Sequence, residues 1–129
     1  MPVATRVASL AEVARLAAGG VEFWYPFKDF LDGFYAAPKQ SALAEEPRTL
    51  AGSIKDGAML DAYLAATGEH LSRLQRWRSP AWVFSASRGL ERPFFFARTH
   101  ELRMILLMDS PAAFRSRNLF VSEDALMRV

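Results

Sequence analysis

The residues best suited to bind a ligand or a partner lie near the C-terminal end, between positions 110 and 121. Arg115, Arg117 and Asn118 stand there beside Phe114 and Phe120. A guanidinium binds phosphate and carboxylate groups and stacks on aromatic rings. Arginine and aromatic residues are also enriched where proteins bind proteins. We therefore predict that this segment forms or braces a partner-binding surface.

Trp82 and Arg88 also belong to this candidate surface, since both lie in the arginine-rich half of the chain. Arg88 in addition precedes an aromatic run at 94–96. Two other interpretations stay open. In one, Phe114 and Phe120 anchor the core, and the arginines hold the loop by hydrogen bonds to carbonyl oxygens. In the other, the arginines and aromatic rings bind nucleic acid by phosphate contacts and base stacking.

Catalytic chemistry finds little support among the residue types. The chain has no cysteine and only two histidines, which leaves few ligands for a transition metal. A zinc-protease helix needs a second histidine four residues after His70, and that position is Leu74. We expect His100 to be a surface residue and Asp61 a solvated charge near a helix end. The sequence predicts no enzyme activity, no metal and no cofactor.

Composition and charge indicate a globular protein. Of 129 residues, 51% are hydrophobic and 23% are charged, and the net charge is only +2. Residues 1–64 carry 6 bases and 8 acids, whereas residues 65–129 carry 10 bases and 6 acids. No apolar run approaches the roughly 20 residues that span a bilayer. We predict a cytoplasmic protein with no membrane partner, and a charge balance too mild to indicate nucleic acid by itself.

Helix signals dominate the chain. Ser9 and Glu12 form a predicted capping box for a helix that ends at Gly19. A second helix is predicted from about 25 to 36, and the longest from about 57 to 77, with a leucine stripe at positions 60, 64, 71 and 74. The sequence predicts an all-α fold, in one domain spanning 1–129. We expect five to seven helices around the one long central helix.

Four smaller expectations concern local structure. Gly68 lies inside the long helix, where another element should approach closely, because an interior glycine costs roughly 1 kcal/mol against alanine. Thr99 should cap a helix. Ser110 should cap a further helix that begins at Pro111, and a last short helix should follow Ser122. No segment alternates as a half-buried strand does.

Short motifs follow one another from about residue 27 to residue 128. They are FLDGFY at 30–35, DAYLAA at 61–66, EHL at 69–71, PAWV at 80–83, RGL at 88–90, PFF at 93–95 and SPAAFRSRNLFV at 110–121. In this order they resemble the small α-helical, antitoxin-like proteins that accompany nucleotidyltransferase-fold proteins in bacteria. The resemblance implies a protein partner and no catalytic residues.

From these observations we predict a non-catalytic protein-binding module. The resemblance implies that its partner is a nucleotidyltransferase-type toxin, which the chain neutralises. The alternative is a small nucleic-acid-binding transcriptional regulator. A steep dependence of DNA or RNA binding on salt would favour the alternative.

Overall fold

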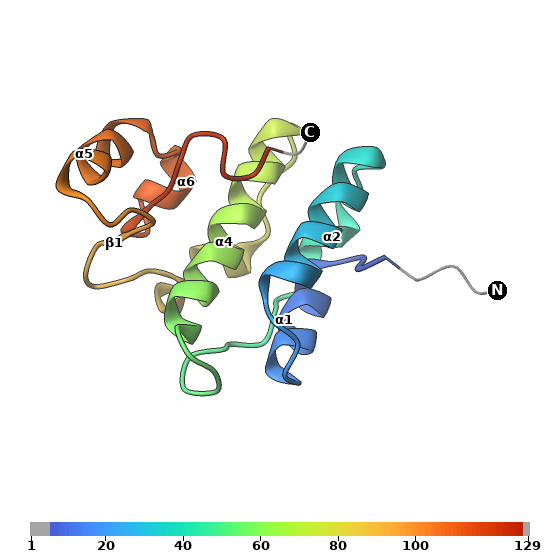
Figure 1. The fold of residues 1–129 in the computed structure, drawn as a ribbon. Coiled ribbons are helices and arrows are strands. Elements are labelled where there is room, and N and C mark those ends of the chain that lie inside the picture. The colour runs from blue at the N-terminus through green and yellow to red at the C-terminus, as the bar shows by residue number, and fades with distance from the viewer. Residues whose placement is uncertain (1–5, 128–129) are drawn as a thin grey trace. The chain divides into compact units, whose positions relative to one another are not determined.

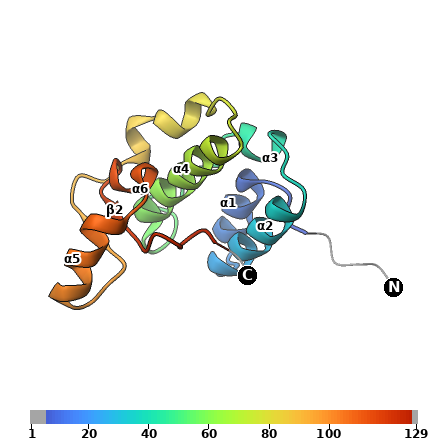
Figure 2. The same ribbon diagram turned by 90° about the horizontal axis from the view of Figure 1, so that it is seen from above.

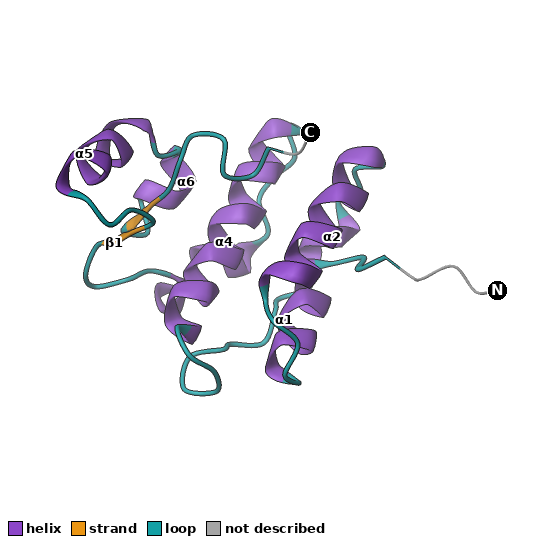
Figure 3. Ribbon diagram, in the orientation of Figure 1, coloured by secondary structure: helices purple, strands orange, loops and turns teal. Residues whose placement is uncertain are grey.

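The computed structural model describes residues 6–127, and these contain six α-helices, two 3-10 helices and two short strands (Figures 1 and 3). Helices take up 53% of the described residues and strands 3%, which confirms the predicted helical class in outline. The contacts divide the chain into two compact units, one up to residue 48 and one from residue 49 to residue 127. The arrangement as a single domain around one central helix stays a prediction.

The first unit contains α1 (Leu10–Ala18), α2 (Trp24–Ala36) and the single turn α3 (Ser41–Ala44). The predicted Ser9 cap of α1 is confirmed, because Ser9 Oγ accepts the N–H of Glu12 at 3.1 Å. The Glu12 carboxylate in turn accepts the N–H of Ala8 at 2.9 Å, one residue further back than Ser9. The helix ends at Ala18, immediately before the predicted Gly19, and Gly20 takes a positive φ of 107°.

Helices α1 and α2 lie side by side in both ribbon views (Figures 1 and 2). On α2, the residues Phe27, Phe30, Leu31 and Phe34 are buried, as their helical spacing predicts. Asp29 lies on the other side of α2 and accepts the N–H of Val7 at 2.7 Å. The chain that enters α1 is therefore fastened to α2 by a side chain.

The second unit begins with α4 (Gly57–Leu74), the longest of the described helices, followed by the 3-10 helices η1 (Ala81–Phe84) and η2 (Ala86–Arg88). Leu60, Leu64 and Leu71 are buried, as predicted. Leu74 is 57% exposed, so its place in the core stripe was wrong. The reason is that α4 ends at Leu74, and Arg76 turns the chain away with a φ of 59°.

Two glycines of α4 mark places where other segments come very close. A Cβ on Gly68 would lie 3.0 Å from Val83 Cγ1 and 3.3 Å from the Trp82 ring. This confirms the predicted close approach and identifies η1 as the element involved. At Gly57, a Cβ would lie 2.0 Å from the carbonyl oxygen of Leu50, so a side chain has no room there.

The last part of this unit contains β1 (Phe94–Phe95), α5 (His100–Asp109), α6 (Ala112–Arg115) and β2 (Leu119–Phe120). The two strands pair in parallel, with Phe94 N–H donating to Asn118 O at 2.8 Å. The sequence shows no alternation here, because two-residue strands are too short to produce that pattern. Figures 1 and 2 both show α6 and the strands between α4 and α5.

Two predicted helix starts were wrong and one is confirmed. Thr99 caps α5, since its hydroxyl accepts the N–H of Leu102 at 3.2 Å. Ser110 does not cap α6, which begins at Ala112; the Ser110 hydroxyl instead lies 2.7 Å from Leu106 O and accepts the N–H of Val121 at 2.8 Å. After Ser122 the chain forms turns and no helix up to residue 127.

Candidate functional site

The structure places most of the predicted site residues in the interior of the second unit. The buried ones are Trp82, Arg88, Phe114, Arg117 and Phe120, while Asn118 is partly buried and Arg115 is exposed. The Phe114 ring contacts the Tyr63 ring edge to face, with 4.9 Å between centroids. The Phe120 ring stacks on Phe95 at 4.7 Å. These two phenylalanines are therefore core residues, as the structural interpretation predicted.

Two acidic residues of α4 hold the two buried arginines. Asp61 and Glu69 are two helical turns apart, which places them on the same side of α4. Arg88 Nη1 lies 3.6 Å from Asp61 Oδ1, and Arg117 Nη1 donates to Glu69 Oε1 at 2.7 Å. Charges so deeply buried require partners, because an isolated charge loses its hydration without compensation. The expectation that Asp61 is solvated was wrong, since it is 1% exposed.

Arg117 connects α4 with two of the elements packed around it. Besides Glu69, its guanidinium donates to Ala113 O of α6 and to Val83 O of η1, each at 2.6 Å. Only 7% of this residue is exposed. Its hydrogen bonds match the interpretation in which the arginine holds the loop through carbonyl oxygens.

Near the N-terminal end of α4, Asp61 and Arg88 form a similar set of buried contacts. Asp61 accepts the N–H groups of Leu50 and Ala51 at 2.7 and 3.1 Å. The guanidinium carbon of Arg88 lies 5.2 Å from the centroid of the Trp82 ring, which is a cation–π contact. Asp61 and Arg88 thus fix the loop before α4 and the 3-10 helices after it.

Asn118 completes the predicted set. It takes a left-handed φ of 62°, which asparagine tolerates better than most residues. Its side-chain Nδ2 donates to Leu90 O at 2.8 Å, so the side chain fastens the segment before β1. Asn118 thus sets the turn of the backbone immediately before β2.

Arg117 is one of the residues that line a surface groove of about 380 Å³. Its lining contains three arginines, Arg73, Arg88 and Arg117, and one acid, Glu69. Arg73 is the exposed member, with 58% of its side chain accessible, and it pairs with Glu69 as the i,i+4 spacing predicts. The described residues that line this groove include no histidine, cysteine or lysine. Guanidinium groups bind anions and do not act as acids or bases near neutral pH. The groove is therefore suited to binding an anion and not to acid–base catalysis.

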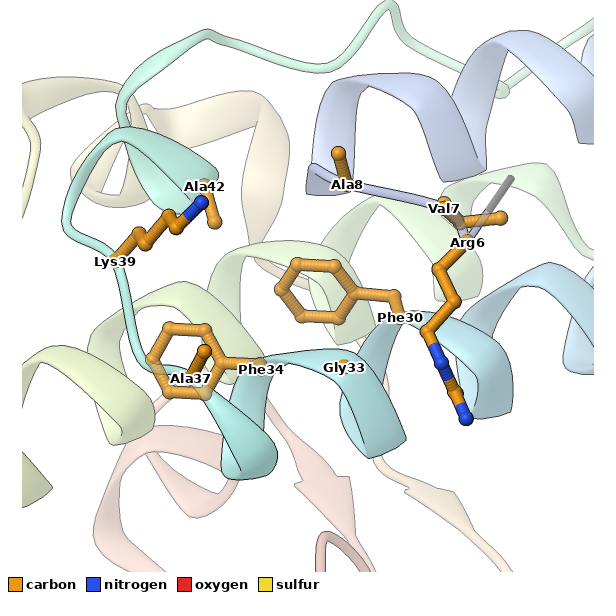
Figure 4. Close-up of a pocket in the computed structure, with 9 residues that line it drawn as sticks. All are labelled: Arg6, Val7, Ala8, Phe30, Gly33, Phe34, Ala37, Lys39 and Ala42. Carbon is orange, nitrogen blue, oxygen red and sulfur yellow. The ribbon is translucent and has the colours of Figure 1, made fainter. Parts of the chain in front are cut away.

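A second, more apolar pocket of about 210 Å³ lies in the first unit. Figure 4 shows Phe30 and Phe34 along it, with Arg6 and Lys39 on opposite sides. Arg6 forms an ion pair with Asp29 at 3.3 Å. The pocket has room for a small apolar group, and nothing in its lining indicates a reaction.

Helix α5 presents an unusual surface. Leu106 is its only buried residue, while the large apolar side chains Leu102, Met104, Ile105, Leu107 and Met108 are exposed, Met108 by 80%. In both ribbon views α5 lies apart from α4 (Figures 1 and 2). An amphipathic helix normally buries its apolar side chains, whereas most of the apolar side chains of α5 are exposed to solvent.

Titratable groups show few shifts that would indicate catalysis. Burial, together with the charge of Arg73, lowers the pKa of His70, and burial raises the pKa of Tyr63. Among residues 6–127, no three histidine, aspartate or glutamate side chains gather where they would hold a metal ion. No helix in that range has the length and apolar content needed to cross a membrane. The absence of a cofactor stays a prediction.

The acid–arginine pairs were the main feature that sequence reasoning missed. A signal was present, since Asp61 and Glu69 are eight residues apart in a stretch of alanine and leucine, where only paired acids are tolerated. Comparisons with protein-family models, curated proteins and solved structures found no match to this chain. The antitoxin-like resemblance stays a prediction.

Proposed function

We propose that this chain is a non-catalytic protein-binding module of the cytoplasm and that α5 is its docking element. The observation that carries the proposal is the set of exposed apolar side chains on α5. Large exposed apolar patches on globular proteins mark interaction sites, and five large apolar side chains are exposed on this one helix. The proposed partner is another protein, of the nucleotidyltransferase type that the resemblance implies, and binding neutralises it.

The way α5 is held supports this role. Leu106 anchors its buried side, and Ser110 joins its C-terminal end to Val121 beside β2. Arg103 Nε donates to Ala97 O at 3.2 Å, and its guanidinium lies over the Phe95 ring at 5.7 Å. The segment from 110 to 121 thus braces the docking helix, and its Arg117, Phe114 and Phe120 are buried behind it.

The chemistry of the exposed side defines the partner surface. Met104 and Met108 lie one turn apart, and their flexible thioether chains adapt to the shape of an apolar groove. Helix-in-groove binding uses apolar anchors at such helical spacing. We therefore propose that the partner offers an apolar groove to α5.

The nucleic-acid alternative has less support. Arg88 and Arg117 are buried and hold carboxylates and carbonyl oxygens of the chain itself, so they are not placed to contact phosphates. Binding of this kind instead requires exposed arginine or lysine side chains along the nucleic acid.

A co-expression experiment tests the proposal. The tagged chain is co-expressed with the product of the adjacent reading frame, and the complex is measured by size-exclusion chromatography and calorimetry. Met108→Asp should weaken the complex by about tenfold or more, as expected for a buried hot-spot anchor, without changing the melting temperature. Met127→Asp is the matched control, because Met127 is an exposed methionine outside α5.

Two outcomes would contradict the proposal. One is a complex that survives Met108→Asp unchanged. The other is the absence of any complex, together with tight, salt-dependent binding of a labelled DNA duplex, which would favour the regulator.

A further inference from the structure

The groove beside Glu69 carries an excess of positive charge. Its lining contains three guanidinium groups and one carboxylate, and the remaining residues of the lining are neutral. The Glu69 carboxylate is already shared, with Oε1 bound to Arg117 and Oε2 bound to Arg73. The buried Asp61 forms an ion pair with Arg88 and so neutralises its charge. The groove is left with one positive charge in excess. The excess lies at the exposed Arg73, where an anion can bind it by charge-assisted hydrogen bonds.

Arg73 is placed to make that contact. It lies near the C-terminal end of α4, and its guanidinium is exposed. Among the described residues, Glu69 is the one protein acceptor that it contacts. A guanidinium has five N–H donors, so one carboxylate partner leaves others for a ligand. Arg117 and Arg88 are fixed in the wall behind it by their buried partners.

The rest of the lining sets the shape and polarity of a ligand. Phe84 and Ala86 supply apolar surface, and Phe84 is exposed at the groove. Ser85 and Ser116 supply hydroxyl groups, of which Ser116 Oγ donates to Ala113 O at 3.2 Å. A volume of about 380 Å³ lies within the usual range of small-molecule sites. An apolar body beside an arginine matches an organic carboxylate better than a bare inorganic ion.

We propose that this groove is a binding site for an organic carboxylate that has an apolar group next to the carboxylate. The carboxylate binds Arg73, and the apolar group lies against Phe84. The proposal is independent of partner binding through α5, because the groove is formed by α4, η1, η2 and the end of α6.

A titration followed by NMR of the ¹⁵N-labelled protein tests this site, with N-acetylphenylalanine as the probe at low ionic strength, where charge contacts are least screened. Its uncharged amide, N-acetylphenylalaninamide, and inorganic phosphate are titrated in parallel. The carboxylate should shift the amide signals of Gly89 and Ser116, and the amide probe should bind about tenfold more weakly, the effect of losing one charge-assisted contact.

Variants then assign the contact. Arg73→Gln should weaken N-acetylphenylalanine binding by about tenfold. Arg78→Gln is the matched control, since Arg78 is exposed in the same stretch and does not line the groove. Phe84→Ser removes the exposed apolar wall and should also weaken binding, and it keeps the test valid if Arg73→Gln unfolds.

Three results would overturn the proposal. They are equal binding of the amide probe, equal loss in the Arg78→Gln control, and tighter binding of phosphate than of the organic carboxylate.

Discussion

Arg117→Ala is the most informative single change in this protein. The substitution removes the buried partner of Glu69 and the donors to Ala113 O and Val83 O. Removing one member of a buried ion pair costs about 3–5 kcal/mol. Each of the two carbonyl groups that loses its donor lowers the free energy of unfolding by about a further 1–3 kcal/mol.

One contact reduces that cost. Arg73 continues to neutralise Glu69 from the exposed side, so the carboxylate is not left without a cation. We therefore expect a total loss of about 3–5 kcal/mol in the free energy of unfolding, which is a large part of the roughly 5–15 kcal/mol of a typical domain.

The assay is urea denaturation followed by circular dichroism, with the stability taken from the midpoint at constant m value. Arg115→Ala is the control, because Arg115 is exposed on the same segment, and it should change stability by less than about 0.5 kcal/mol. A loss below about 1 kcal/mol for Arg117→Ala, with the partner complex weakened instead, would refute the structural role and restore the interface interpretation.

Two further predictions concern the core and the pH dependence of stability. Leu71→Ala should cost about 2–5 kcal/mol, because Leu71 is fully buried, whereas Leu74→Ala at the exposed end of α4 should cost less than about 0.5 kcal/mol; urea midpoints of the two variants decide. The pKa of His70 is lowered in the folded state, so its contribution to stability is present above the unfolded value of 6.5 and is lost as the pH falls through the folded pKa. His70→Gln should therefore flatten the fall in urea midpoint between about pH 7 and pH 5, and an unchanged slope would show that other groups cause it.

Local sequence signals determined much of the secondary structure. Ser9 and Thr99 form the predicted caps, because each side chain accepts an N–H only three positions further along the chain. The periodic apolar residues of α2 and α4 identified their helices for the same reason, since burial of one side follows from a spacing of three and four residues. Gly68 indicated a close approach, because a glycine inside a helix needs such a reason.

Contacts between distant segments were decided only by the tertiary structure. No local pattern pairs Glu69 with Arg117, which is 48 residues away, or shows that Asp61 is buried beside Arg88. Ser110 followed the local pattern of a helix cap, yet its hydroxyl binds Val121, because the chain folds back to bring that N–H within reach. The sequence determined where helices form, since their hydrogen bonds are local. The tertiary structure determined which arginines are buried and that the apolar residues of α5 are left exposed, since burial depends on every segment that packs nearby.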